Sequence, residues 1–102
     1  MTKVKLLRIN NDIQEVKISG HAFYADYGED IVCSAISMLC YTIANKLLTI
    51  EEKNIIVNIE EGKFEISIQK ITADNQLLIS TLIMGLEMLE EQYSKNVKIE
   101  EV

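Results

Sequence analysis

Alternating apolar and polar residues predict β-strands that bury one face, and five stretches of the chain are interpreted as strands. They cover about Lys3–Ile9, Ile13–Ser19, Asn54–Glu60, Lys63–Gln69 and Val97–Glu101. The segment Asn10-Asn11-Asp12 separates the first two strands and Glu61-Gly62 separates the next two. Both segments consist of residues that favour tight turns, so the first four strands are predicted to form two antiparallel hairpins.

Two longer segments repeat apolar residues at three- and four-residue steps, the spacing of one helix face. They run from Ile31 to about Glu51 and from about Asp74 to Tyr93. Asp30 directly precedes the first helix and is predicted to cap it, because its carboxylate can accept hydrogen bonds from N–H groups of the first turn. The element order is then ββαββαβ. Since short hairpins join the strands, we expect an α+β fold with a largely antiparallel sheet and two packed helices.

The second predicted helix is apolar around most of its circumference. Its large apolar residues are Leu77, Leu78, Ile79, Leu82, Ile83, Leu86, Met88 and Leu89. Only a narrow stripe remains for water, made of Ser80, Met84, Glu87 and Glu91. Such a helix is predicted to bury one side on the sheet and another on a partner, with Gly85 allowing close approach. A homodimer is therefore expected, although the other helix of the same chain could also cover this face.

Length and composition favour one ordinary globular domain. With 102 residues, of which 48% are hydrophobic, the chain is expected to form a single domain over residues 1–102. The first residues lack the long apolar core of a signal peptide, and we expect no apolar run long enough to cross a bilayer. These features predict a cytoplasmic protein without membrane contact.

The charge of the chain bears on its partners. A net charge of −6 argues against direct contact with the phosphate backbone of a nucleic acid. An acidic surface could attract a basic peptide, but the same charge also keeps soluble proteins dispersed, which is the simpler explanation.

The two cysteines, Cys33 and Cys40, are seven positions apart on the first predicted helix. That spacing places their Cα atoms roughly 10 Å apart, which is too far for a disulfide, so both are expected to be free thiols. With a single histidine in the chain they do not make the four-ligand set of a structural zinc site. We expect neither a metal nor a cofactor.

His21 and Cys33 are the residues that suggest catalysis, because a thiol and an imidazole together form a nucleophile with its own base. Cys33 is predicted in the first turn of a helix. There the positive end of the helix dipole favours the thiolate, and free N–H groups could stabilise an oxyanion. The alternatives are a cysteine of the core and a solvated histidine at a strand end, and the spacing alone leaves them open.

The segment around this pair has a specific pattern. Gly20-His21-Ala22 is followed by Gly28, by Asp30-Ile31-Val32-Cys33 and by Ser37. This pattern resembles the signature of the bacterial ribosomal-processing cysteine proteases, and the length and the order ββαββαβ also fit that family. Members usually carry alanine after the cysteine, where this chain has Ser34; the exchange leaves the His–Cys pair unchanged.

The resemblance implies a function. Members of the family remove the N-terminal extension of large-subunit ribosomal protein twenty-seven, act as homodimers, and cut after two bulky aromatic residues. For this chain it implies that Cys33 attacks the scissile carbonyl to form a thioester, and that His21 is the base and acid of a dyad. The expected partner is a precursor ribosomal protein that carries an N-terminal extension.

Four further residues are expected to support the site. Ser37 lies one turn beyond Cys33 and either binds substrate or permits close packing. Asp30 is expected to cap the helix rather than take part in the chemistry. Gly28 is interpreted as a hinge of the loop or as an ordinary turn glycine. Tyr24 and the other aromatic residues of the loop either stack on substrate or pack the loop onto the domain.

A second hypothesis is a non-catalytic dimeric module that binds a ribosomal protein during assembly. The acidic charge and the apolar second helix favour it, and His21 and Cys33 would then be structural residues. Processing of a precursor distinguishes the two hypotheses.

Overall fold

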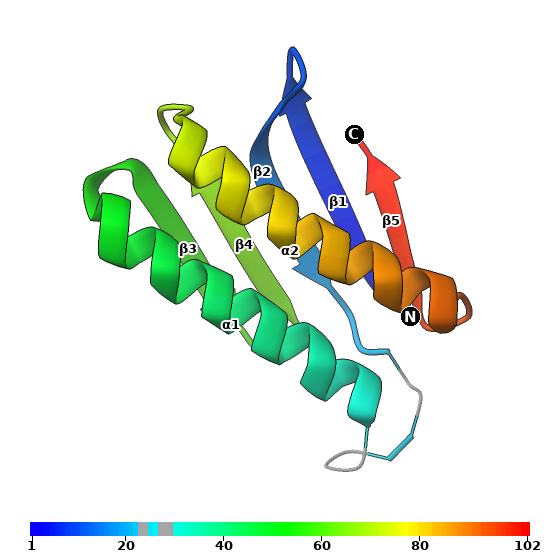
Figure 1. Ribbon diagram of the computed structural model, residues 1–102. Coiled ribbons are helices and arrows are strands. Elements are labelled where there is room, and N and C mark those ends of the chain that lie inside the picture. The colour runs from blue at the N-terminus through cyan, green and yellow to red at the C-terminus, as the bar shows by residue number, and fades with distance from the viewer. Residues whose placement is uncertain (23–24, 27–29) are drawn as a thin grey trace.

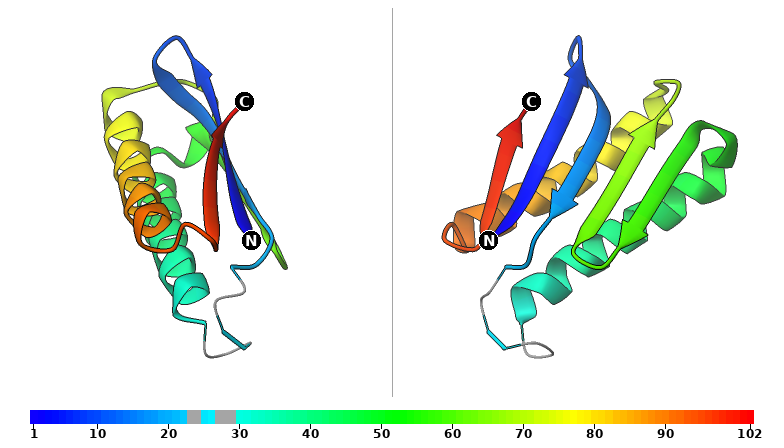
Figure 2. Two further views of the ribbon diagram at one scale, coloured as in Figure 1. Left: turned by 90° about the vertical axis from the view of Figure 1, so that its right-hand side faces the viewer. Right: turned by 180° about the vertical axis from the view of Figure 1, so that it is seen from behind.

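The computed structural model describes residues 1–22, 25–26 and 30–102, and its elements form two layers (Figure 1). The strands are β1 (Thr2–Ile9), β2 (Asp12–Ser19), β3 (Ile55–Glu60), β4 (Lys63–Ile68) and β5 (Val97–Glu101). The helices are α1 (Ile31–Glu51), the 3₁₀ turn η1 (Glu52–Asn54) and α2 (Ala73–Gln92). Both long helices cover the same face of the sheet (Figure 2). The predicted α+β class and the order ββαββαβ are confirmed.

The strands lie in the order β3-β4-β2-β1-β5. The pairs β1–β2, β2–β4 and β3–β4 are antiparallel, whereas β1 and β5 are parallel, with Thr2 opposite Val97. The helix α2 carries the chain from β4 across the sheet to this edge, so the first and last strands become neighbours (Figure 1). The sheet is therefore largely antiparallel, as predicted, and the parallel edge is a feature that hairpin patterns do not reveal.

The two faces of the sheet differ as the alternation predicts. Residues that face the helices are buried, among them Val4, Leu6, Val16, Ile18, Phe64, Ile66 and Ile68. The opposite face carries charged side chains: Lys5, Lys17 and Glu65 are neighbours across three strands. The hydrophobic core consequently lies between the sheet and the two helices.

The helices α1 and α2 pack against each other, and Gly85 marks their close approach. A Cβ atom at Gly85 would lie 2.9 Å from both terminal carbons of Leu39. The missing side chain therefore makes room for Leu39 of the same chain. The close approach expected at Gly85 is thus made by the other helix of the same chain, which is one of the two alternatives that the sequence leaves open.

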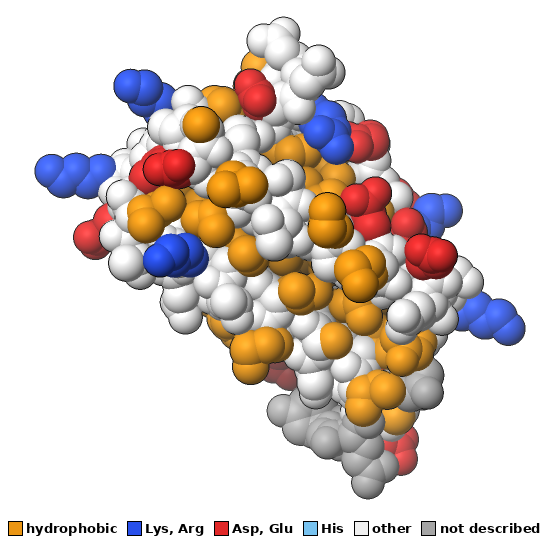
Figure 3. Space-filling model, viewed as in Figure 1, with side chains coloured by type: hydrophobic (Ala, Val, Ile, Leu, Met, Phe, Trp, Pro, Cys, Tyr) orange, Lys and Arg blue, Asp and Glu red, His pale blue; other side chains and the backbone are white. Residues whose placement is uncertain are grey.

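The outer face of the two helices is more apolar than predicted. Ser80, Met84, Glu87 and Glu91 are exposed as expected, but so are Leu77 and Met88. Hydrophobic side chains follow both helices on this side of the molecule (Figure 3). We refer to the following exposed residues as the outer helix face: Ile31, Met38, Leu77, Met84 and Met88. The sheet and α1 cover one side of α2. The outer helix face lies on its other side, and no described part of the chain covers it.

The span Ile31–Asn54, which contains α1, is long and apolar enough to cross a membrane by length and composition. By that measure, the expectation that the chain has no apolar run long enough to cross a bilayer is wrong. The core helix of a soluble protein passes the same test. Here one face of α1 is buried in the core, through Val32, Ile36, Cys40, Ile43, Ala44 and Leu47.

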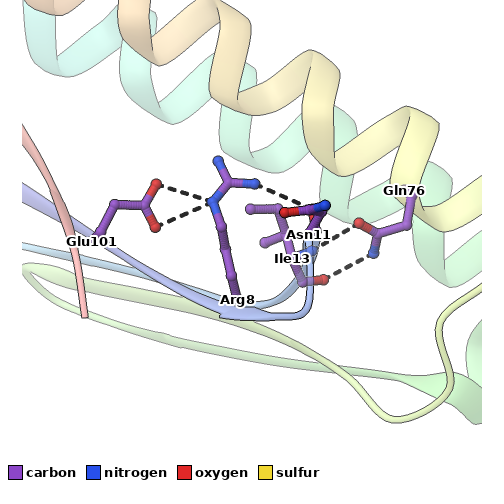
Figure 4. A network of polar contacts seen from close by, with 5 residues as sticks. All are labelled: Arg8, Asn11, Ile13, Gln76 and Glu101. Carbon is purple, nitrogen blue, oxygen red and sulfur yellow. Dashed lines mark hydrogen bonds and ion pairs between the residues drawn. The ribbon is translucent and has the colours of Figure 1, made fainter.

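The first turn of α2 is tied to the sheet by the side chain of Gln76 (Figure 4). The register of β1 against β2 shifts after Leu7, so that Gln14 has no partner on β1. At this irregularity the amide of Gln76 accepts from the Ile13 N–H at 2.8 Å and donates to the Ile13 carbonyl at 2.8 Å. The backbone N–H and carbonyl of Ile13 are thus satisfied, and α2 is fixed along the sheet.

A polar network joins the end of α1 to the start of α2. The half-buried carboxylate of Glu51 accepts hydrogen bonds from the Thr72 hydroxyl at 2.6 Å and from the side-chain amides of Asn54 and Asn75. Asn75, which is fully buried, also completes a capping box with Thr72. The hydrogen bond from Thr72 is the main reason that the pKa of the Glu51 carboxyl lies below its ordinary value.

This lowered pKa predicts a stability loss in acid. Since the folded state favours the ionised carboxylate, Glu51 stabilises the fold above its unfolded-state pKa of about 4.3, and this contribution is lost as the pH falls through the folded-state value. We expect Glu51→Gln to lower the free energy of unfolding at neutral pH and to flatten its fall in acid. Urea titrations across the pH range measure both effects. The matched control is Glu52→Gln, an exposed neighbour, and an equal loss in that variant would contradict the assignment.

Candidate active site

The segment that carries His21 begins at a fixed point. Gly20 follows β2 with φ +87°, and a Cβ atom there would lie 2.5 Å from the Met1 carbonyl oxygen. Its N–H donates a 2.9 Å hydrogen bond to the carbonyl of Gly62 in the β3–β4 turn. Both the backbone angle and the contact with Met1 require glycine at this position.

The β3–β4 turn borders the imidazole of His21. Gly62 has φ +73°, and a Cβ atom at this position would lie 3.5 Å from His21 Nε2. The turn that closes the second hairpin therefore forms one side of the histidine site. This contact joins residues that are about 40 positions apart, and the sequence pattern offers no sign of it.

Ala22 connects the histidine segment to Cys33. Its side chain is buried, with 1% exposed. Its N–H donates to Cys33 Sγ at 3.4 Å, and its carbonyl accepts from Asn96 Nδ2 at 2.9 Å. Since Ala22 follows His21 directly, these contacts bring the backbone beside the histidine onto the sulfur of the cysteine.

Asp30 positions Cys33 from the other side. Its Oδ1 accepts the N–H of Val32 at 3.0 Å and that of Cys33 at 2.9 Å, so the predicted N-cap of α1 is confirmed. Such a cap typically contributes about 1 kcal/mol of stability. One expectation changes, however. The N–H groups of Val32 and Cys33 are committed to Asp30, so they are not the free oxyanion donors that the first turn was expected to offer.

A cleft of about 650 Å³ brings the described site residues together. His21, Asp30, Cys33 and Ser37 all line it. The half-buried Cys33 and the exposed Ser37 are one helical turn apart on α1 and both face the cleft, as the spacing predicts. Tyr24 and Gly28, the other two predicted site residues, lie outside the described part of the chain.

One wall of the cleft is apolar, and this wall was not predicted from the sequence. Ile36, Cys40, Tyr41, Ile59 and Phe64 contribute to this wall. The rings of Tyr41 and Phe64 meet edge to face, with centroids 6.1 Å apart and an interplanar angle of 87°. Tyr41 lies four residues after Ser37, a spacing that could have placed it beside the site. Phe64 comes from β4, and only the folded chain brings it there.

The two thiols have different environments. Cys40 is 2% exposed, and burial raises the pKa of its thiol to about 12. It therefore remains a neutral side chain of the core. Cys33 is half-buried at the cleft and accepts the hydrogen bond from Ala22. Within the described residues, no three His, Cys, Asp or Glu side chains gather into a set that could hold a metal ion.

Both the sequence and the fold match known proteins. The family model for cysteine protease Prp matches residues 1–98. Two curated relatives are named ribosomal processing cysteine protease Prp. The relative from Staphylococcus aureus is 26% identical to this chain over 90 residues, and the relative from Bacillus subtilis is 27% identical over 94 residues. Each alignment covers 85% of this chain, and they cover 85% and 84% of the relatives.

A solved structure has the same fold as this chain over its whole length. The crystal structure of the essential ribosomal processing protease Prp from S. aureus, in complex with a covalently linked product peptide, superposes with a TM-score of 0.93 at 25% identity. The match covers 100% of both chains. Because the family model spans nearly the whole chain, and because the histidine and cysteine of the motif line one cleft, the chain belongs to the Prp family of cysteine proteases.

Proposed function

We propose that this protease uses Cys33 as its nucleophile and His21 as its general base and acid. The observation that carries the proposal is the hydrogen bond from the Ala22 N–H to Cys33 Sγ, which holds the residue after His21 against the sulfur. Both side chains also line the same cleft, beside an apolar wall that a peptide side chain could fill. A thiol, an imidazole and a peptide-sized cleft are the components of thiol-dependent acyl transfer.

The reaction then follows the chemistry of the two groups. His21 takes the thiol proton, and the thiolate of Cys33 attacks the scissile carbonyl carbon, while the π electrons move to the oxygen. As the carbonyl re-forms, the C–N bond breaks and the imidazolium gives its proton to the leaving amine. His21 next removes a proton from water, which adds to the thioester. The C–S bond then breaks, the carboxylic acid product leaves, and the imidazolium of His21 returns its proton to the thiolate of Cys33.

Asp30 and Ser37 act through placement in this scheme. Asp30 holds Cys33 in the first turn of α1 through the two capping hydrogen bonds. Ser37 presents a hydroxyl to the cleft one turn further along, where it can bind the peptide backbone of the substrate. No proton transfer is assigned to either residue.

The substrate that we propose is the precursor of large-subunit ribosomal protein twenty-seven, which carries an N-terminal extension. The resemblance implies cleavage after two bulky aromatic residues. The apolar wall with Tyr41 and Phe64 supports this choice, because its edge-to-face pair offers ring surface to an aromatic side chain. We place the reaction in the cytoplasm, where a free thiol stays reduced.

We also propose that the chain acts as a homodimer through the outer helix face. The central part of this face is free of charge: no charged residue occurs from Ile31 to Asn45 on α1 or from Asn75 to Leu86 on α2. Depletion of charge at the centre, with charges such as Glu87 at the margin, is typical of a protein interface. Three of its exposed side chains are methionines, which adapt well to an opposing surface.

The nucleophile is tested by incubating the protein with the extended precursor and measuring the products by mass spectrometry. We expect one cut after the paired aromatic residues. Cys33→Ala should lower the rate by several orders of magnitude, as loss of a nucleophile does, with an unchanged fold. The matched control is Cys40→Ala, which should retain cleavage.

An intact precursor in the presence of folded, reduced wild-type protein would contradict the proposal. Stable precursor binding without cleavage would favour the non-catalytic module that binds a ribosomal protein during assembly.

The two thiols should also differ in alkylation. With a pKa of about 12, only about 10⁻⁴ to 10⁻⁵ of the Cys40 side chains are thiolate near neutral pH, and the core covers them. We expect iodoacetamide to label Cys33 in the folded protein and to reach Cys40 only after denaturation. Peptide mapping after timed labelling measures both rates, and equal rates in the folded protein would count against an accessible nucleophile at Cys33.

The dimer is tested by a charge at the centre of the outer helix face. Met84 is 63% exposed, so Met84→Glu should leave the fold intact and shift the molar mass in light scattering from dimer to monomer. The control is Ile56→Glu, at a position 44% exposed on β3, which should remain dimeric. A wild-type protein that is monomeric at micromolar concentration, or a dimeric Met84 variant, would overturn the assignment of this face.

A further inference from the structure

Ala22 is held from three sides although it lies in a connection between a strand and a helix. The side chain is buried, the N–H donates to Cys33 Sγ at 3.4 Å, and the carbonyl accepts from Asn96 Nδ2 at 2.9 Å. The N–H and the carbonyl belong to the two peptide groups on either side of the Ala22 Cα, so hydrogen bonds restrain both of these groups. The amide of Asn96 is therefore a second support for the contact with the sulfur.

Asn96 is itself firmly placed. Its N–H donates to the Tyr93 carbonyl at 2.8 Å, in the turn that follows α2, and its own carbonyl accepts the Thr2 N–H at 2.9 Å. The second bond extends the parallel pairing of β1 with β5, which begins at Thr2 and Val97. The side chain of Asn96 thus projects from a turn that is anchored to both α2 and the sheet, and it can transmit this rigidity to Ala22.

We propose that Asn96 is a positioning residue that keeps the Ala22 N–H directed at Cys33 Sγ and thereby favours the thiolate. The proposal rests on the proposed function of Cys33 as the nucleophile. An N–H group aimed at sulfur stabilises the anion more than the neutral thiol, because hydrogen bonds to charged acceptors are the stronger ones. The N–H groups of Val32 and Cys33 donate to Asp30 and not to the sulfur. The Ala22 N–H, in contrast, donates to Cys33 Sγ itself.

The proposal predicts a change in the reactivity of the sulfur rather than in substrate binding. Asn96→Asp and Asn96→Ala both remove the amide donor, and the first keeps the shape of the side chain while placing an oxygen against the Ala22 carbonyl. In both variants the pH midpoint of iodoacetamide alkylation at Cys33 should move upward by about one pH unit, which is tenfold less thiolate below the midpoint. At neutral pH, kcat for peptide cleavage should fall about tenfold while KM changes by less than about twofold.

Two controls separate positioning from a general loss of stability. Lys95→Ala changes the exposed neighbour in the same turn and should leave both readouts unchanged. Asn75→Ala removes a buried amide at the opposite end of α2 and should lower the melting temperature without moving the alkylation midpoint. An unchanged midpoint in both Asn96 variants, or an equal shift in Asn75→Ala, would overturn the proposal.

A measurement on the wild-type protein keeps the proposal testable if the Asn96 variants do not fold. The NMR shift of the Ala22 amide proton should titrate with the midpoint found for Cys33 alkylation, and an amide proton that ignores this titration would overturn the contact. Because alkylation and NMR need no substrate, their outcome is separate from that of the cleavage assay. If the wild-type protein does not cleave the precursor, only the protease function is refuted.

Discussion

The cap that Asp30 places on α1 is the interaction on which the site depends. By accepting the N–H groups of Val32 and Cys33, it determines where the helix begins, and each residue of an α-helix is turned by about 100° from the one before. A start one residue earlier or later would rotate Cys33, Ser37 and Tyr41 together around the helix axis. The cleft exists because the correct start turns these three side chains toward β3 and β4.

The sheet supplies the opposite half of the cleft through backbone as well as side chains. Gly20 and Gly62 approach each other across the ends of β2 and the β3–β4 turn, and both have positive φ. Side chains at these positions would strain the backbone next to His21. The histidine thus borders a surface made of two glycines, while the cysteine borders the apolar wall of α1 and β4.

Local sequence signals predicted much of this arrangement. The strands, both helices, the Asp30 cap and the shared cleft of His21 and Cys33 follow from periodicity, turn residues and the motif. The features that could not be predicted are contacts between distant segments. Nothing near Asn96 indicates that its amide reaches Ala22, and nothing in β5 indicates that it pairs with β1. Gly85 was predicted to allow close approach, but the identity of its neighbour, Leu39, depends on how the two helices cross.

The parallel pair of β1 and β5 has a consequence for the order in which the molecule is completed. Thr2 and Val97 are 95 positions apart, and their pairing closes the intervening residues into one loop. During synthesis β1, β2 and α1 emerge before the turn that carries Asn96, because this turn follows α2 in the chain. The support beneath Ala22 is therefore added only after α2, so a nascent chain carries both His21 and Cys33 well before the surroundings of the sulfur are complete.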